Sequence, residues 1–179
     1  MKHILPFLIL SLANLQINCD NASIVAEYAK SKVGWGYIFG ASGEICTHDL
    51  MIKLSGPCRL FDYKSYRSWA GKKVFDKTGF VNQAFLQVGI KLDTKAIIIF
   101  GVPKWEATGE IANYPKNKVC ILYKKNEKGK FVHKGIYIGN GEYIYAKGSL
   151  EGVVKEEMTG EWTHWAIQEG LYNKEWKNF

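Results

Sequence analysis

The most constraining feature of this sequence is a change of pattern between its two halves. The first half carries apolar residues at helical spacing, and the second carries short apolar or alternating runs separated by Gly, Asn and Lys turns. Helices followed by an antiparallel sheet are typical of an α+β domain. We therefore predict N-terminal helices packed on a C-terminal antiparallel sheet of about five to six short strands. The runs assigned to strands cover residues 119–123, 131–138, 143–146, 153–154 and 162–167.

Two helices stand out in the first half. Ser23 is placed to cap the first, over residues 24–30. The second covers residues 78–88, where apolar side chains recur at helical spacing, and Gly89 ends it. Between and after them the pattern favours shorter features: a helical piece at 47–54, a buried run at 97–100 and a loop from there to Pro115.

The N-terminal segment differs from the rest of the chain. Residues 1–19 carry Lys2 and then a short, nearly continuous apolar run. This pattern is typical of a secretory signal peptide and is too short for a membrane-spanning helix; the alternative is a buried N-terminal helix. With 179 residues, the chain has room for one ordinary domain, which we place at 22–179. We therefore expect a secreted, extracellular protein without a transmembrane segment after removal of the signal.

Cysteine usage is sparse for an exported chain. Removal of residues 1–19 leaves Cys46, Cys58 and Cys120, an odd number. A Cys46–Cys58 bridge joins the nearest pair, but the sequence does not fix the pairing. No Cys-x-x-Cys motif or Cys/His cluster has the spacing of a zinc site. We expect neither a metal nor another cofactor.

The charge is basic but dispersed. The formal net charge is +7, and loss of the first 19 residues removes Lys2 and no acid, leaving +6. The lysines are not clustered with aromatic residues, so nucleic acid is not an expected partner. A cationic secreted protein is attracted to anionic bacterial walls. The alternative is that the charge only keeps the protein soluble.

Two short blocks carry the chemical information. Residues 76–79 read Asp-Lys-Thr-Gly at the start of the 78–88 helix, and residues 133–141 read His-Lys-Gly-Ile-Tyr-Ile-Gly-Asn-Gly on a predicted strand. They resemble the two catalytic blocks of the NlpC superfamily of papain-like cell-wall cysteine peptidases. Further segments that resemble its phage-like and protozoan members lie at 33–40, 43–47, 69–76, 152–154 and 162–165. The resemblance implies the papain-like NlpC fold.

The family's chemistry gives roles to particular positions. Its first block reads Asp-Cys-Ser-Gly; the cysteine is the nucleophile, and a helix start and a neighbouring imidazole favour its thiolate. Here Lys77 stands at the nucleophile position and His133 at the base position. A third polar residue orients the imidazole, and Tyr145 holds that place, twelve positions after His133. Tyrosine can form a hydrogen bond, but it supplies no negative charge at neutral pH.

The resemblance also implies contacts with substrate. Tyr37 matches the tyrosine that lines the family's cleft, and Asp76 matches the residue that meets the free amine of a peptidoglycan stem peptide. Thr78 replaces the usual serine beside the nucleophile. Stem peptides or muropeptides are therefore the expected partners.

Several of these residues can also be interpreted without a catalytic role. His133 is equally consistent with a half-buried strand residue, and Cys120 with a small buried hydrophobe rather than a substitute nucleophile. A helix start and an imidazolium would both lower the pKa of Lys77, which is one condition for an amine nucleophile. The amide that such an amine forms does not turn over readily, however, and Thr78 points about 100° away around the helix.

Three functions follow from these patterns. The leading hypothesis is an exported, catalytically impaired or inactive NlpC-type domain that binds muropeptides through the former active-site cleft. The second is an active peptidoglycan endopeptidase that cleaves stem peptides. The third is an interaction or decoy protein that regulates an active paralogue.

Overall fold

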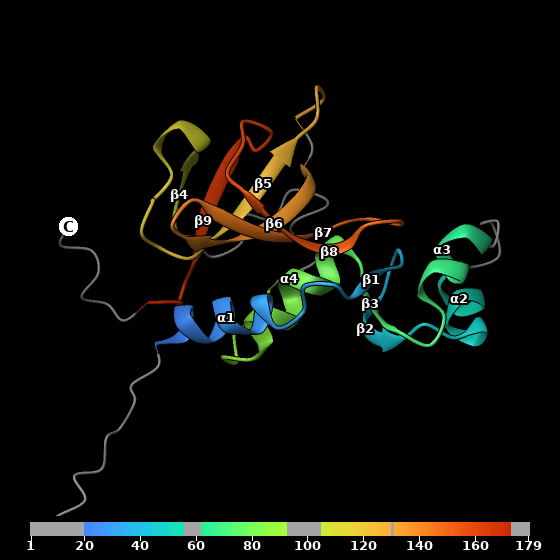
Figure 1. Cartoon of the computed structure of the whole chain (residues 1–179). Coiled ribbons are helices and arrows are strands. Elements are labelled where there is room, and N and C mark those ends of the chain that lie inside the picture. The colour runs from blue at the N-terminus through green and yellow to red at the C-terminus, as the bar shows by residue number, and fades with distance from the viewer. Residues whose placement is uncertain (1–19, 56–61, 93–104, 130, 173–179) are drawn as a thin grey trace, which may run out of the picture.

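The computed structural model describes residues 20–55, 62–92, 105–129 and 131–172, and its fold is α+β (Figure 1). The α+β prediction is confirmed. In chain order the elements are α1 (Asn21–Lys30), β1 (Gly36–Tyr37), β2 (Ser42–Ile45), α2 (His48–Ser55), α3 (Tyr63–Trp69), β3 (Lys73–Phe75), α4 (Lys77–Leu86), β4 (Trp105–Glu110), the 3-10 turn η1 (Ile111–Asn113), β5 (Cys120–Lys125), β6 (Phe131–Gly139), β7 (Glu142–Gly148), β8 (Gly152–Glu157) and β9 (His164–Gln168).

The larger sheet has six strands in the order β4-β9-β5-β6-β7-β8, with every neighbouring pair antiparallel. Helices α1 and α4 lie side by side against it, and α4 crosses β6 and β7 (Figure 1). The apolar faces of these elements form the main core. Its fully buried side chains include Phe80, Phe85, Ile121, Leu122, Ile136 and Ile144.

A second, smaller layer lies beside the start of α4. Strands β1, β3 and β2 form a three-stranded sheet, with α2 and α3 beyond it (Figure 1). Its own apolar cluster is Ile38, Ala41, Cys46, Met51, Trp69 and Val74. Because the backbone N–H of Asp76 donates to the Ala41 carbonyl at 2.8 Å, this layer fixes the chain just before α4.

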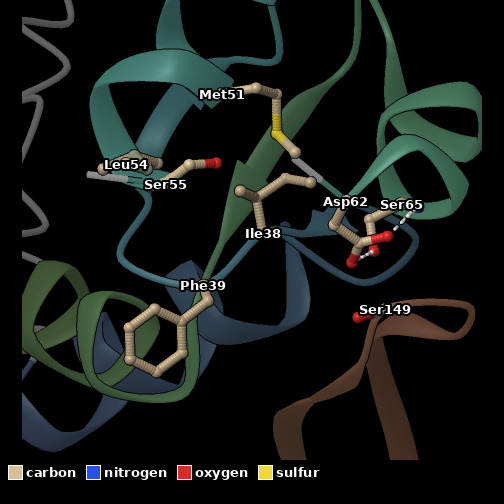
Figure 2. A pocket seen from close by; sticks show the side chains of 8 residues that line it. All are labelled: Ile38, Phe39, Met51, Leu54, Ser55, Asp62, Ser65 and Ser149. Atoms are coloured by element: carbon tan, nitrogen blue, oxygen red, sulfur yellow. Dashed lines mark hydrogen bonds between the residues drawn. The ribbon is translucent and has the colours of Figure 1, made fainter. Parts of the chain in front are cut away.

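A pocket of about 180 Å³ opens in this smaller layer (Figure 2). Its walls are mainly apolar, and the Asp62 carboxylate at its edge already caps α3 by accepting from the backbone N–H of Ser65 at 3.0 Å. Neither Lys77 nor His133 is part of its lining, which is Ile38, Phe39, Met51, Leu54, Ser55, Asp62, Ser65 and Ser149.

The helix boundaries correct one expectation. Ser23 is not the cap of α1: the helix begins at Asn21, and Asp20 accepts a 2.7 Å hydrogen bond from the backbone N–H of Ser23. A carboxylate three residues before that N–H is an equally good cap, and it starts the helix three residues earlier. The predicted helical piece at 47–54 is α2.

Several elements were missed by the pattern, among them the short strands β1, β2 and β3 of the smaller layer. Residues 105–110 form β4 instead of the expected loop, and residues 63–69 form α3. Strand β4 is an edge strand that pairs only with β9, and it contains Gly109, so its sequence lacks the usual alternation. The predicted run at 97–100 and the predicted signal peptide at 1–19 lie outside the described residues. Within the described part of the chain, no helix is long and apolar enough to cross a membrane.

Candidate functional site

The start of α4 is held by the two ends of the Asp-Lys-Thr-Gly block. Asp76 Oδ1 accepts from the backbone N–H of Gly79 at 2.5 Å and so caps the helix, while Oδ2 accepts from the backbone N–H of Gly40 at 2.9 Å. Gly79 packs so closely against the smaller layer that a Cβ atom would lie 2.2 Å from the Ala41 carbonyl oxygen. Both residues therefore have structural roles that do not require a nucleophile between them.

Lys77, the first residue of α4, faces His133 on β6. The Lys77 Nζ atom lies 3.5 Å from His133 Nε2, and both side chains are half-buried. Strand β6 lies between β5 and β7, and His133 is paired with Lys124 on β5, so the sheet presents the imidazole to the helix start. The structure thus brings together the two residues that the sequence places at the nucleophile and base positions, and an amine occupies the space before the imidazole.

Burial and nearby positive charge both lower the pKa values of this pair. Burial lowers the pKa of His133, and the nearby cations Lys77 and Lys124 lower it further, while Glu161 opposes them. Burial also lowers the pKa of Lys77, against the attraction of Asp76. Because a lowered pKa favours an unprotonated imidazole at neutral pH, the Lys77 ammonium can donate to a neutral Nε2.

Replacement of Lys77 by Met is expected to raise the pKa of His133. The Met side chain keeps most of the buried volume but removes the positive charge that disfavours the imidazolium. The measurement is an NMR pH titration of the His133 ring resonances in both proteins. The exposed Lys30→Met variant on α1 is the matched control and should leave the titration unchanged. An equal His133 pKa in wild type and Lys77→Met would show that the ammonium does not act on the ring.

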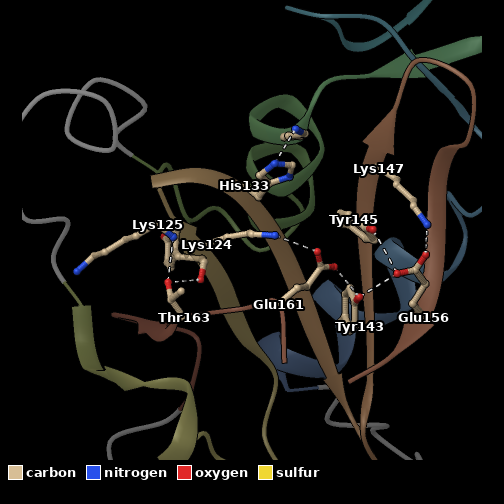
Figure 3. Close-up of polar contacts among 11 residues, drawn as sticks. Lys124, Lys125, His133, Tyr143, Tyr145, Lys147, Glu156, Glu161 and Thr163 are labelled. Carbon is tan, nitrogen blue, oxygen red and sulfur yellow. Dashed lines mark hydrogen bonds and ion pairs between the residues drawn. The ribbon is translucent and has the colours of Figure 1, made fainter. Parts of the chain in front are cut away.

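In the described part of the chain, no hydrogen bond joins Tyr145 to His133. It lies on β7 and is 4% exposed, its ring packs edge-on against Trp162, and its hydroxyl donates to Glu156 Oε2 at 3.2 Å. Burial and the neighbouring carboxylates hold the pKa of this phenol above its ordinary value. Tyr145, which the sequence places at the third position, is thus a packed aromatic residue whose hydroxyl is directed toward Glu156 (Figure 3).

The sequence interpretation missed the charged residues around His133. Lys124 stands directly across from His133 in the β5–β6 pairing, and its Nζ lies 3.4 Å from Glu161 Oε2. The Tyr143 hydroxyl, at 3.0 Å from Glu161 Oε1 and 2.9 Å from Glu156 Oε2, links these two carboxylates (Figure 3). Residues 128–129, which read Lys-Gly, contained the signal, because a hairpin turn there sets Lys124 against the strand that carries His133.

A buried lysine lies beneath the same helix start. Lys134 is 6% exposed, and its Nζ donates to Thr78 Oγ1 at 3.3 Å. Burial lowers the pKa of Lys134 to about 8. The Thr78 hydroxyl is thus engaged with Lys134, and Tyr37 lies half-buried on β1 against the main core. The substrate-binding roles of Tyr37, Asp76 and Thr78 stay predictions.

The described thiols are remote from solvent. Cys46 is 1% exposed and Cys120 is 0% exposed, and burial raises the pKa of both. Cys46 forms no disulfide with another described residue, and its expected partner Cys58 lies outside the described part of the chain. Among those residues no group of three or more His, Cys, Asp or Glu side chains is arranged to hold a metal ion.

The model of the NlpC/P60 family matches residues 64–170, which is more than half of the chain and includes α4, β6 and β7. The chain belongs to the NlpC/P60 family. Its fold is that of an NlpC/P60 peptidoglycan hydrolase-like domain. No curated protein sequence matches it.

Solved structures of other NlpC/P60 proteins have the same fold. The peptidoglycan hydrolase RipB from Mycobacterium tuberculosis superposes with a TM-score of 0.55 at 22% identity, over 85% of this chain and 66% of that one. NlpC1 from Trichomonas vaginalis superposes with a TM-score of 0.55 at 16% sequence identity, over 86% of this chain and 46% of that one. The P60 domain of an antigen from M. avium subspecies paratuberculosis superposes with a TM-score of 0.51 at 17% sequence identity, over 85% of this chain and 96% of that one. This chain spans 61% of the RipA chain that it matches and 66% of RipB.

Proposed function

We propose that this NlpC/P60 domain is a secreted, hydrolytically inactive protein that binds peptidoglycan stem peptides in the former active-site cleft. The observation that carries the proposal is the Lys77–His133 pair, in which an amine lies 3.5 Å from the imidazole at the position of the family's thiol. The family is associated with peptidoglycan, which supports a ligand of that class.

The chemistry of an amine explains why we expect no turnover. Attack of Lys77 Nζ on a peptide carbonyl would expel the leaving amine and join the acyl group to the lysine through a new amide. That amide is as resistant to water as the bond that was broken, whereas the thioester of a cysteine peptidase is readily hydrolysed. Lys77 would therefore act once at most.

Substitute nucleophiles are disfavoured by their surroundings. Cys46 and Cys120 are buried, with thiol pKa values raised by that burial, so neither forms thiolate readily. The Thr78 hydroxyl already accepts a hydrogen bond from Lys134. Tyr145 donates to Glu156 and does not orient the base.

Digestion of purified sacculi tests the loss of hydrolysis. Wild-type protein and the Lys77→Ala variant are each incubated with sacculi, and soluble fragments are analysed by mass spectrometry. We expect no stem-peptide fragments above the no-protein blank from either. Fragments released by the wild type and lost with Lys77→Ala would favour the active endopeptidase instead, and a mass gain on Lys77 would reveal single-turnover acylation.

Isothermal titration with stem-peptide fragments tests binding. We expect saturable heat with the folded wild-type protein. The absence of heat at millimolar ligand, with circular dichroism showing a folded chain, would remove the binding part of the proposal. Recovery of the protein from the medium of its native source, with an N-terminus after residue 19, is the expected result for secretion.

A further inference from the structure

The Lys77 ammonium is a half-buried cation without a contacting counter-ion. Among the described residues no carboxylate forms an ion pair with it, and its hydrogen-bond partner is His133 Nε2. An ammonium has three N–H donors, so two remain after the bond to the imidazole. A partly desolvated charge in this state gains when an anion approaches.

The nearest acids are already engaged. Both Asp76 oxygens accept from backbone N–H groups, of Gly79 and Gly40. Glu161 is shared between Lys124 Nζ at 3.4 Å and the Tyr143 hydroxyl at 3.0 Å. Neither Asp76 nor Glu161 therefore reaches Lys77 Nζ without giving up contacts that hold other parts of the site.

A second cation, Lys124, adds to the positive potential around Lys77 and His133. Lys124 stands across from His133 on the adjacent strand, and it acts electrostatically on both His133 and Lys77. The Lys124 side chain is 37% exposed, so this second cation is in part open to solvent. The positive end of α4, a helix of ten residues that begins at Lys77, adds to this field.

We infer that the Lys77–His133–Lys124 cluster is an oxyanion-binding site that takes a carboxylate of a bound peptide. The carboxylate accepts from the two remaining Lys77 N–H groups, with Lys124 as a second donor. This inference rests on the proposed function and extends it, because it names the chemical group that the cleft selects. The replacement that removes the nucleophile thus supplies a cation for recognition.

The test compares two ligands that differ only in that group. N-acetyl-D-alanyl-D-alanine and its C-terminal carboxamide are titrated into the full protein by isothermal calorimetry, with inorganic phosphate as a third arm. We expect the free acid to bind at least about tenfold more tightly than the carboxamide, as charged hydrogen bonds are worth more than neutral ones. The bound acid should also raise the pKa of His133, measured by NMR, because it offsets the positive charge of Lys77.

Variants separate recognition from folding. Lys77→Met should remove the preference for the acid, and Lys124→Gln should weaken it, while Lys30→Met should leave it unchanged. Equal affinity for acid and carboxamide in the wild type would overturn the inference and leave the proposed peptide binding intact. An increase in the pKa of His133 with phosphate but not with the acid would overturn the assignment to a carboxylate. If neither peptide binds, peptide binding in the proposed function fails as well.

Discussion

Substitution of Gly79 by Ala is expected to destabilise the protein severely. In most helices this change is stabilising by about 1 kcal/mol, because Ala is the better helix former. Here the new Cβ would lie 2.2 Å from the Ala41 carbonyl oxygen and 2.8 Å from Ser42 Oγ. The Ala41 carbonyl cannot retreat easily, since it accepts the backbone N–H of Asp76 at 2.8 Å. We expect a loss of about 3 kcal/mol or more in the free energy of unfolding.

Urea denaturation followed by tryptophan fluorescence measures this loss. The free-energy difference is taken from the shift in the urea midpoint, provided that the m-value is the same in both proteins. Gly160→Ala is the matched control, because a Cβ at Gly160 meets no atom within 4 Å. It should change the stability by less than about 0.5 kcal/mol. A Gly79→Ala protein as stable as wild type would show that the smaller layer can move away from α4, and the start of the helix would then not be fixed as described.

The sequence predicted the parts of the fold that have strong local patterns. Helix α4 was found because Phe80, Val81, Ala84 and Phe85 recur on one buried face, and the central strands were found from their apolar runs. Strand β4 was missed because it is an edge strand whose pairing with β9 comes from more than fifty residues away. Such a pairing leaves little trace in the residues of the strand itself.

The candidate site was predicted as far as the family pattern extends. The Lys77–His133 contact followed from two aligned blocks. The Lys124 neighbour did not, because it depends on the register of the β5–β6 hairpin and the family pattern does not include it. Tyr145 lies on β7, the strand beside that of His133, and only the structure shows that its hydroxyl donates to Glu156. Side-chain direction is set by packing against Trp162, which a sequence pattern does not encode.

Replacement of Lys77 by Cys is expected to create a reactive thiol without restoring much hydrolysis. The helix start, His133 and Lys124 all favour thiolate, so the new thiol should react with iodoacetamide at least about tenfold faster at pH 7 than an ordinary cysteine. The buried Cys46 and Cys120 should remain unlabelled in the folded protein. Hydrolysis of sacculi should stay low, because nothing in the described structure orients the His133 ring as the third residue of a triad does.

A second substitution at the third position should separate thiolate formation from catalysis. Glutamate is unsuitable there, because a buried carboxylate would face Glu156, which already accepts from the Tyr145 hydroxyl. Lys77→Cys combined with Tyr145→Gln offers an amide oxygen to the imidazole and an amide N–H to Glu156, and we expect at least about tenfold more fragment release than from Lys77→Cys alone. Lys77→Cys with Tyr145→Phe is the matched control, since it keeps the ring against Trp162 and offers no polar atom. If the Gln and Phe combinations released fragments at the same rate, the orientation of His133 would not limit catalysis, and Lys77 alone would account for the proposed loss of hydrolysis.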